Sequence, residues 1–349
     1  MPMKKQLLLL SFIIFGCQNL EQYDPEISKK ALNLSSKALF QAISIVDEDA
    51  AWISGHQASF AQTLDGGQSW KVFRHESDTL QFRDVHAFDK SNIVLMSAGT
   101  GISSRIYLFN ADEESYQETY VMPHPEGFLN TIEFWDDQLG MAFGDSFYGE
   151  LFALKTADGG KNWERIDPAK MPKAGLGEGG FAASGTCISL QLDGKAWIAT
   201  GAGGNSRILI TADYGNSWEA YDNPIIKGDA AGVTSINMLN AQVGVIVGGD
   251  LAIPDEYTDN AAITQDGGKT WKLTNKPKTK GAFYGSTIAT INNSKIIFAS
   301  GPKGLDYSFD MGQSWSILDT ANYWAVKIHA KGFGYAVGKD GKVLKLEID

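Results

Sequence analysis

One short pattern, Ser/Thr-x-Asp-x-Gly-x-x-Trp, occurs five times in this 349-residue chain. The copies read TLDGGQSW, TADGGKNW, TADYGNSW, TQDGGKTW and SFDMGQSW, and they end at Trp70, Trp163, Trp218, Trp271 and Trp315. Four fixed positions do not easily recur five times by chance, so the pattern marks a repeated structural unit. The chain is therefore expected to be a repeat protein.

The residues of the pattern indicate a hairpin turn, because each copy lies between two short apolar segments. The Asp carboxylate and the Ser/Thr hydroxyl can accept hydrogen bonds from backbone N–H groups in the turn, and Gly supplies a positive φ. The Trp ring is expected to pack against the stacked sheets. We call these hairpins box turns. A catalytic role would require five active sites, so a structural role is predicted for their aspartates, Asp65, Asp158, Asp213, Asp266 and Asp310.

The segments GMAFGD…TADGGKNW and GVIVGG…TQDGGKTW carry a family resemblance. They resemble the bacterial neuraminidase repeat, or Asp-box, propellers, and among these they are most similar to the photosystem II stability and assembly factor family. The resemblance implies a β-propeller that assists assembly, without implying photosynthesis. Sialidases, glucanases, sorting receptors and assembly factors all carry the box, so the motif does not specify function.

The repeat period predicts the number of blades. The first interval between box aspartates is about twice the later ones, so a degenerate copy is expected inside it, with Phe109, Ala111, Glu113 and Tyr116 in the box positions. Seven strand pairs are expected to start near residues 41, 82, 130, 186, 234, 286 and 323. The predicted fold is all-β, a seven-bladed propeller of four-stranded antiparallel blades in one domain over residues 33–349.

The chain ends at KVLKLEID, one strand short of a complete last blade. An uncovered strand edge invites pairing with other chains. The segment ALNLSSKALF, residues 31–40, lies just before the first blade and is predicted to supply the missing outer strand. An N-terminal strand would thus close the ring.

The N-terminus reads as a targeting segment. An apolar run over residues 7–15 is too short to span a bilayer, and it is followed by Gly16 and Cys17. This ending resembles a bacterial lipobox, so residues 1–16 are interpreted as a lipoprotein signal peptide, Cys17 as the acylated residue and residues 17–32 as a polar tether. The expected location is exported and lipid-anchored, on the periplasmic side of a bacterial membrane or at the cell surface. An ordinary cleaved secretory signal is the alternative.

Composition argues against several partners and cofactors. The formal net charge is -11, and the only basic group is the loop with Lys276, Lys278 and Lys280, so no nucleic-acid partner is expected. The five histidines show no metal-ligand spacing, and no motif for a cofactor is present. The acidic loop from Asp250 to Asp259 is more simply solvated than a calcium site. Cys187 reads as a buried strand residue without a disulfide partner, and a monomer is expected.

A candidate binding face follows from propeller geometry. The loops between blades and those between second and third strands open on one face, whereas the box turns lie on the other. Two connections on that face are long, residues 167–180 and 249–260. The candidate binding residues there are Arg83, Asp84, Arg105, Asp145, Tyr148, Glu178, Arg207, Asp250 and Trp324.

The leading functional hypothesis is a membrane-tethered binding or assembly-assisting module for a protein or glycan partner. The alternative is a sialidase-like glycoside hydrolase, in which Arg83, Arg105 and Arg207 would hold a substrate carboxylate near Asp145, Tyr148 or Glu178. The Arg-Ile-Pro strand of sialidases is absent, and the same arginines are more simply interpreted as solvated or as ion pairs between blades. A redox-type propeller is a further, weaker alternative.

Overall fold

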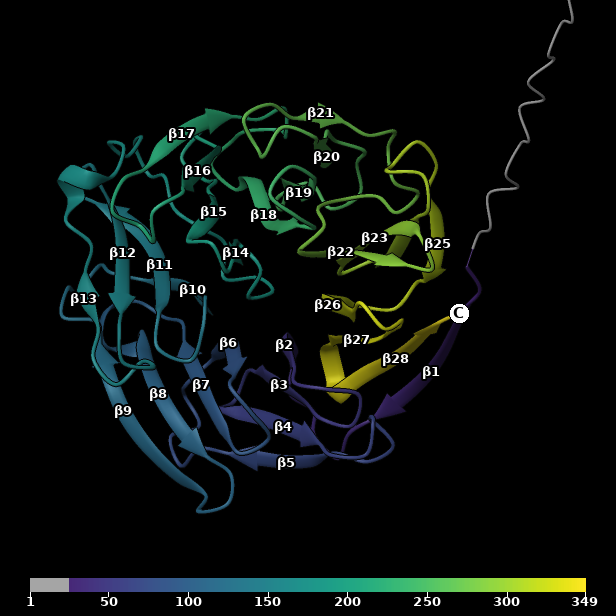
Figure 1. Cartoon of the computed structure of the whole chain (residues 1–349), viewed down its shortest axis with the longest axis horizontal. Coiled ribbons are helices and arrows are strands. Elements are labelled where there is room, and N and C mark those ends of the chain that lie inside the picture. Colours follow the sequence, from purple (N-terminus) through teal and green to yellow (C-terminus); the bar gives the residue numbers. More distant parts are fainter. Residues whose placement is uncertain (1–24) are drawn as a thin grey trace, which may run out of the picture.

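The computed structural model describes residues 25–349. Residues 1–24 lie outside this part of the chain, and with them Cys17, the predicted signal peptide and most of the predicted tether. The described residues form a ring of seven four-stranded antiparallel sheets around a central axis, which confirms the predicted seven-bladed propeller (Figure 1).

The strands follow in chain order, four to a blade. Blades 1 to 3 contain β2 (Phe40–Ile45), β3 (Ala51–Gly55), β4 (Ser59–Thr63), β5 (Lys71–Arg74); β6 (Phe82–Ala87), β7 (Asn92–Ser97), β8 (Arg105–Asn110), β9 (Ser115–Val121); and β10 (Leu129–Phe134), β11 (Gly140–Phe147), β12 (Glu150–Thr156), β13 (Glu164–Arg165). Blades 4 to 6 contain β14 (Ile188–Gln191), β15 (Lys195–Ala199), β16 (Arg207–Thr211), β17 (Glu219–Asp222); β18 (Ala231–Met238), β19 (Gly244–Asp250), β20 (Ala261–Thr264), β21 (Lys272–Leu273); and β22 (Gly285–Ile291), β23 (Ser294–Gly301), β24 (Gly304–Ser308), β25 (Ser316–Asp319).

Blade 7 contains β26 (Tyr323–His329), β27 (Phe333–Gly338), β28 (Lys342–Ile348) and, as its outer strand, β1 (Ile27–Asn33). Three short 3-10 turns are η1 (Gly101–Ser103), η2 (Pro168–Lys170) and η3 (Lys339–Gly341). The seven inner strands start close to the positions predicted from the repeat period. The box motif and the strand pairs in the sequence therefore located the blades.

Apolar side chains between neighbouring blades hold the ring together. Blades 1 and 2 are joined by an aromatic cluster in which the Phe60 ring stacks on Phe73 at 5.3 Å and meets Phe109 edge-on at 4.8 Å, with Trp52 beside them. Such pairs add about 0.5–1.5 kcal/mol each beyond area burial. The box Trp side chains extend this packing, since the Trp70 ring meets Tyr335 of blade 7 at 5.4 Å.

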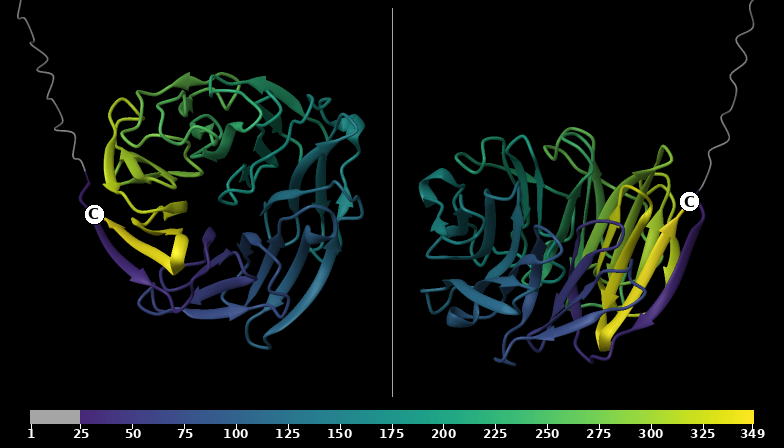
Figure 2. Two further views of the ribbon diagram at one scale, coloured as in Figure 1. Left: turned by 180° about the vertical axis from the view of Figure 1, so that it is seen from behind. Right: turned by 60° about the horizontal axis from the view of Figure 1, so that its bottom comes forward.

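An N-terminal strand closes the ring, as predicted, but it starts earlier than the predicted segment 31–40 and shares only residues 31–33 with it. Strand β1 pairs with β28 through seven antiparallel residue pairs, from Ile27 with Ile348 to Asn33 with Lys342 (Figures 1 and 2). Residues 27–32 were assigned to the tether and instead belong to the propeller. Their side chains are mostly exposed, as in other outer strands, so no apolar alternation marked them. Residues 34–39 lead inward to β2.

The five box turns share one hydrogen-bond pattern. In blade 4, Thr211 Oγ1 donates to Asp213 Oδ1 at 2.7 Å and accepts from Gly215 N at 3.0 Å, while Ser217 N donates to Asp213 Oδ1 at 2.9 Å. The other four turns repeat these contacts. Partial desolvation would raise the pKa of Asp213, but the hydrogen bonds from Ser217, Thr211 and backbone N–H groups outweigh it and lower the pKa to about 2.

Asp213→Ala should lower the free energy of unfolding by about 1 kcal/mol, near the low end for unpaired donors because the turn is partly exposed. Because the folded pKa lies below the unfolded value of 3.8, this contribution is present above pH 4 and is lost as the pH falls toward 2. Urea titrations of the parent and of Asp213→Ala at pH 7 and pH 2.5 measure this contribution to the free energy of unfolding. The difference in stability between the parent and Asp213→Ala should shrink in acid. The control Asp229→Ala, at an exposed aspartate, should be as stable as the parent at both pH values. An equal loss at both pH values would contradict the turn role.

Blade 2 keeps the hairpin without the box motif, as the repeat period predicted. Asn110 Oδ1 accepts from the N–H groups of Asp112 at 3.0 Å and Glu113 at 2.9 Å, so one amide replaces the Thr and Asp pair. Tyr116 takes the place of Trp and packs on Phe109 at 4.7 Å. The outer strand that follows, β9, has seven residues, whereas the outer strands after box turns have two to four.

Candidate functional site

The two faces of the ring differ in what they present. The loop face carries the connections between blades and those between second and third strands. The turn face carries the box turns and the turns between first and second strands. In Figure 1 the chain before β14 reaches toward the axis of the ring. We call residues 179–186, which end this long connection, the axial segment.

The axial segment contacts blades on opposite sides of the axis. The carbonyl oxygen of Ala182 accepts from Gln41 Nε2 of blade 1 at 2.9 Å and from Arg83 NH1 of blade 2 at 3.3 Å. Ser184 Oγ donates to the carbonyl of Tyr284 of blade 6 at 2.7 Å. These bonds cross the mouth of the central channel on the loop face, so the chain itself occupies that position.

Hydroxyl groups continue the contacts around the axis. Ser184 Oγ lies 2.5 Å from Thr186 Oγ1, which donates to Ser235 Oγ of blade 5 at 2.7 Å, and Ser235 Oγ lies 2.9 Å from Ser286 Oγ of blade 6. The axial segment needs small residues because the inner strands lie close to it around the axis. A Cβ at Gly185, where φ is +66°, would lie 2.2 Å from Asp84 Oδ1. The composition GGFAASGT therefore reflects packing at the axis.

An ion pair fixes the start of the axial segment. Glu178 is buried and accepts from Arg207 Nε at 3.0 Å, Arg207 NH2 at 2.7 Å, Thr200 Oγ1 at 2.7 Å and Gly175 N at 2.8 Å. Burial alone would raise the pKa of Glu178, but these hydrogen bonds outweigh it and the pKa lies below its usual value. Two of the predicted binding residues, Glu178 and Arg207, thus hold each other and the long connection.

Two further predicted binding residues also serve the axial region. Asp145 Oδ1 accepts from Asn130 Nδ2 at 2.8 Å and from Gly180 N at 3.2 Å, and burial raises its pKa. Asp84 is buried at the join of blades 2 and 3, where its Oδ2 accepts from Ile132 N at 2.8 Å. Burial raises the pKa of Asp84 to about 8. The fold thus buries Asp84 and leaves Asp145 half-buried.

The three arginines of the sialidase hypothesis have separate partners. Arg83 donates to Gln81 and to the axial segment, Arg207 to Glu178, and Arg105 NH1 to Glu118 Oε2 at 2.6 Å. Since no acceptor is shared, the structure does not bring them together as a carboxylate clamp. The geometry therefore gives no support to a sialidase site at these residues.

The remaining predicted residues lie at or near the surface of the loop face. Tyr148 is 83% exposed and its hydroxyl lies 3.2 Å from His124 Nε2. Trp324 is half-buried and meets Tyr284 edge-on at 4.7 Å. Asp250 ends β19 and accepts from Ala252 N at 2.8 Å, which caps the second long connection. Of these three, Tyr148 is the residue most available to a partner.

Several large exposed apolar side chains lie on the loop face. Ile102, Tyr148, Leu176 and Tyr257 are 67%, 83%, 92% and 48% exposed, and each lies in a loop of this face in blades 2 to 5. We call these four residues the apolar set. Leu64 and Leu192 lie on the turn face, and Ile317 lies on an outer strand. Among the described residues, four of the seven large exposed apolar side chains thus lie on the loop face.

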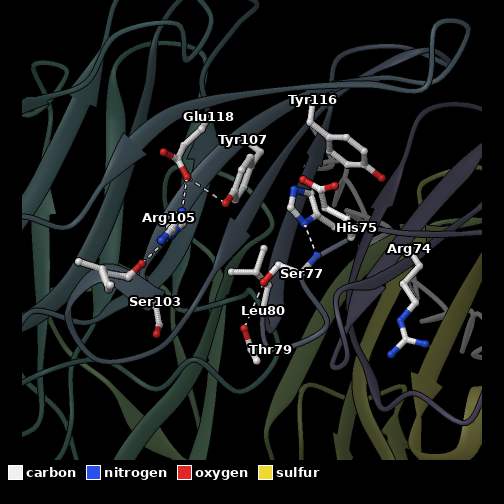
Figure 3. Close-up of a pocket in the computed structure, with 12 residues that line it drawn as sticks. Arg74, His75, Ser77, Thr79, Leu80, Ser103, Arg105, Tyr107, Tyr116 and Glu118 are labelled. Atoms are coloured by element: carbon white, nitrogen blue, oxygen red, sulfur yellow. Dashed lines mark hydrogen bonds and ion pairs between the residues drawn. The ribbon is translucent and has the colours of Figure 1, made fainter.

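A cavity of about 880 Å³ lies on the loop face between blades 1 and 2, away from the axis (Figure 3). On one side Arg105 and Tyr107 both donate to Glu118, and on the other side lie His75 and Arg74. The sequence interpretation identified only Arg105 here. The other lining residues were missed. Their one signal in the sequence was that blade 2 lacks the box motif, because the hairpin of this blade provides Tyr107, Tyr116 and Glu118.

Over residues 25–349 no three His, Cys, Asp or Glu side chains are grouped closely enough to hold a metal ion. No helix within that range is long and apolar enough to cross a membrane. Cys187 is buried just before β14, and burial raises the pKa of its thiol.

Comparison with known proteins gives a structural likeness. No family model matches the chain, and no curated protein matches it in sequence. The structure of YCF48 bound to D1 peptide aligns with a TM-score of 0.66 at 16% identity, covering 94% of this chain and 96% of that one. YCF48 from Cyanidioschyzon merolae gives a TM-score of 0.65 at 14% identity, with 92% and 99% covered. The RRP9 WD40 repeats give 0.63 at 12%, with 93% and 100% covered. The chain therefore shares the seven-bladed propeller fold of YCF48 and of WD40 proteins.

Proposed function

We propose that this protein is a binding module that assists the assembly of a partner protein, which docks on the loop face. The observation that carries the proposal is the apolar set, four large side chains exposed on one face of a ring whose channel mouth is already occupied by its own chain. A broad face with exposed apolar side chains offers contact area to a partner protein.

Two likenesses support a protein partner. The structurally similar YCF48 has been solved with a D1 peptide bound. The box repeats resemble those of assembly factors, and we include the assignment of the chain to the Asp-box propellers in this proposal. A protein is favoured over a glycan because the apolar set contains two aliphatic side chains, which do not stack on sugar rings.

The test substitutes three of the four residues of the apolar set by alanine. The triple variant Ile102→Ala, Tyr148→Ala and Leu176→Ala should reduce capture of the partner from a membrane extract at least tenfold, because truncated hot-spot residues typically cost more than 1 kcal/mol each. The matched control, Leu64→Ala, Leu192→Ala and Ile317→Ala, removes similar area elsewhere and should bind like the parent. Equal capture by both triple variants would contradict the proposal, as would cleavage of a glycoside that disappears in the first variant.

We further propose that the propeller is exported and held at a bacterial membrane through acylated Cys17. Several acyl chains give stable anchoring without a spanning helix, since each buried methylene contributes about 0.8 kcal/mol. Cys17→Ala should move the protein from the membrane pellet to the soluble fraction after cell lysis. Retention in the pellet at the level of the parent would show that another contact holds it. Cys187→Ala is the control and should leave the distribution unchanged.

A further inference from the structure

The outer strand of blade 2 is an unusual edge. Strand β9 is the last strand of its sheet and has seven residues, and it lies along the outer rim of the ring (Figure 1). A long free edge presents a row of backbone donors and acceptors to any extended chain. The other seven-residue outer strand, β1, carries Lys29 and Lys30 near its centre, and lysines discourage such pairing. Strand β9, with the sequence SYQETYV, has no lysine, arginine or proline.

The cavity between blades 1 and 2 runs beside this edge. Tyr116 and Glu118 of β9 line it, two residues apart and therefore on one face of the strand. A chain added to β9 would place alternate side chains on the same face, next to Tyr116 and Glu118. The cavity of about 880 Å³ has room for one or two such side chains.

The far wall of the cavity carries two hydrogen-bond donors, Arg74 and His75, beside the carboxylate of Glu76. Arg74, at the end of β5, is exposed and makes one hydrogen bond among the described residues, from Nε to the carbonyl of Gln57 at 3.1 Å. His75 Nδ1 accepts from Ser77 N at 3.1 Å, which places the proton of the neutral ring on Nε2 and makes that atom a donor. Glu118 is already held by Arg105 and Tyr107. Arg74 forms no ion pair among the described residues, so a carboxylate is the ligand group that suits it, and Leu80 and Ile102 can cover the methylene groups of such a ligand.

We propose that an extended, acidic peptide segment of the partner adds as a strand to the free edge of β9 and places a carboxylate in the cavity beside Arg74. This inference rests on the proposed function and assigns part of the loop face a specific role. In this mode of recognition, backbone hydrogen bonds between the peptide and β9 supply affinity, and the cavity supplies the preference for an acidic side chain.

The test selects random nonapeptides displayed on phage against the purified full chain. Enriched peptides, made synthetically with amidated C-termini, should carry Asp or Glu at one shared position. Arg74→Glu should weaken their binding about tenfold or more, and Arg74→Gln should weaken it less. Lys272→Glu, at an exposed lysine on the outer strand β21, is the matched control and should bind within about twofold of the parent. Thermal melting of each variant checks that the fold is kept.

Hydrogen exchange locates the bound peptide. Backbone amides of residues 115–121 should exchange more slowly with peptide bound, while those of β17, an outer strand in blade 4, should not change. Peptides that bind but protect only other loops, with no response to Arg74→Glu, would overturn the β9 site and leave the proposed function standing. A selection that enriches no peptide would also overturn the β9 site. The proposed function is tested separately, by capture of the partner with the two triple variants.

Discussion

Deleting residues 25–33 should prevent the ring from closing and leave an aggregation-prone protein. The deletion removes the seven residue pairs between β1 and β28 and exposes β28 as a free edge. At roughly 0.5–1.5 kcal/mol for each lost hydrogen bond, the cost is about 5 kcal/mol. A domain has only about 5–15 kcal/mol of stability in total, so much of the soluble protein should be lost. Thermal melting and light scattering measure the effect.

A control and a rescue make this prediction specific. Deleting residues 18–24, which precede the described chain, should leave melting unchanged. A synthetic peptide of residues 25–34, added to the shortened protein, should restore part of the melting temperature because it can pair with β28 in trans. A shortened protein that melts like the parent would mean that β1 does not hold the ring closed.

Gly185→Ala should lower the free energy of unfolding by about 2–5 kcal/mol. The residue has φ of +66°, which costs an L side chain about 1–2 kcal/mol, and the new Cβ would lie 2.2 Å from Oδ1 of buried Asp84. Forcing extra atoms into a packed site adds about 1–3 kcal/mol. Urea unfolding gives the change in the free energy of unfolding.

Gly204→Ala separates the backbone cost of a positive φ from the steric cost of the close contact with Asp84. Gly204 has φ of +77° and open space around its Cβ position, so alanine there carries the backbone cost alone. The variant at Gly185 should therefore lose clearly more stability than the variant at Gly204. Equal losses would show that the axial segment can move away from Asp84 without cost, and that its contacts across the axis are weak.

Local periodicity explains why so much of the fold could be predicted. The box turns and the alternating inner strands are short-range signals, and they located seven blades, including blade 2 without its box. Strand β1 was placed too late in the chain because the prediction took the segment directly before the first blade. The polar sequence ISKKALN gains its strand identity only from pairing with β28. Pairing between the two ends of a chain leaves no local pattern.

The site was less predictable for a related reason. The sequence can place Arg83, Arg105 and Arg207 on one face, but their partners are set by contacts between distant segments. The axial segment reads as an ordinary Gly/Ala/Ser loop, and its role appears only when Ala182 and Ser184 meet blades on opposite sides of the ring. Exposure of Tyr148 and Leu176 likewise depends on how the loops fold.

Photo-crosslinking in cells tests most directly whether the loop face binds a protein. A photoreactive benzoylphenylalanine would replace Tyr148 or Leu176 on the loop face and, as controls, Leu64 or Leu192 on the turn face. We predict one discrete crosslinked protein from positions 148 and 176 and none from positions 64 and 192. Crosslinks from the turn face alone, or no crosslink from either face, would contradict a binding module that acts through its loop face.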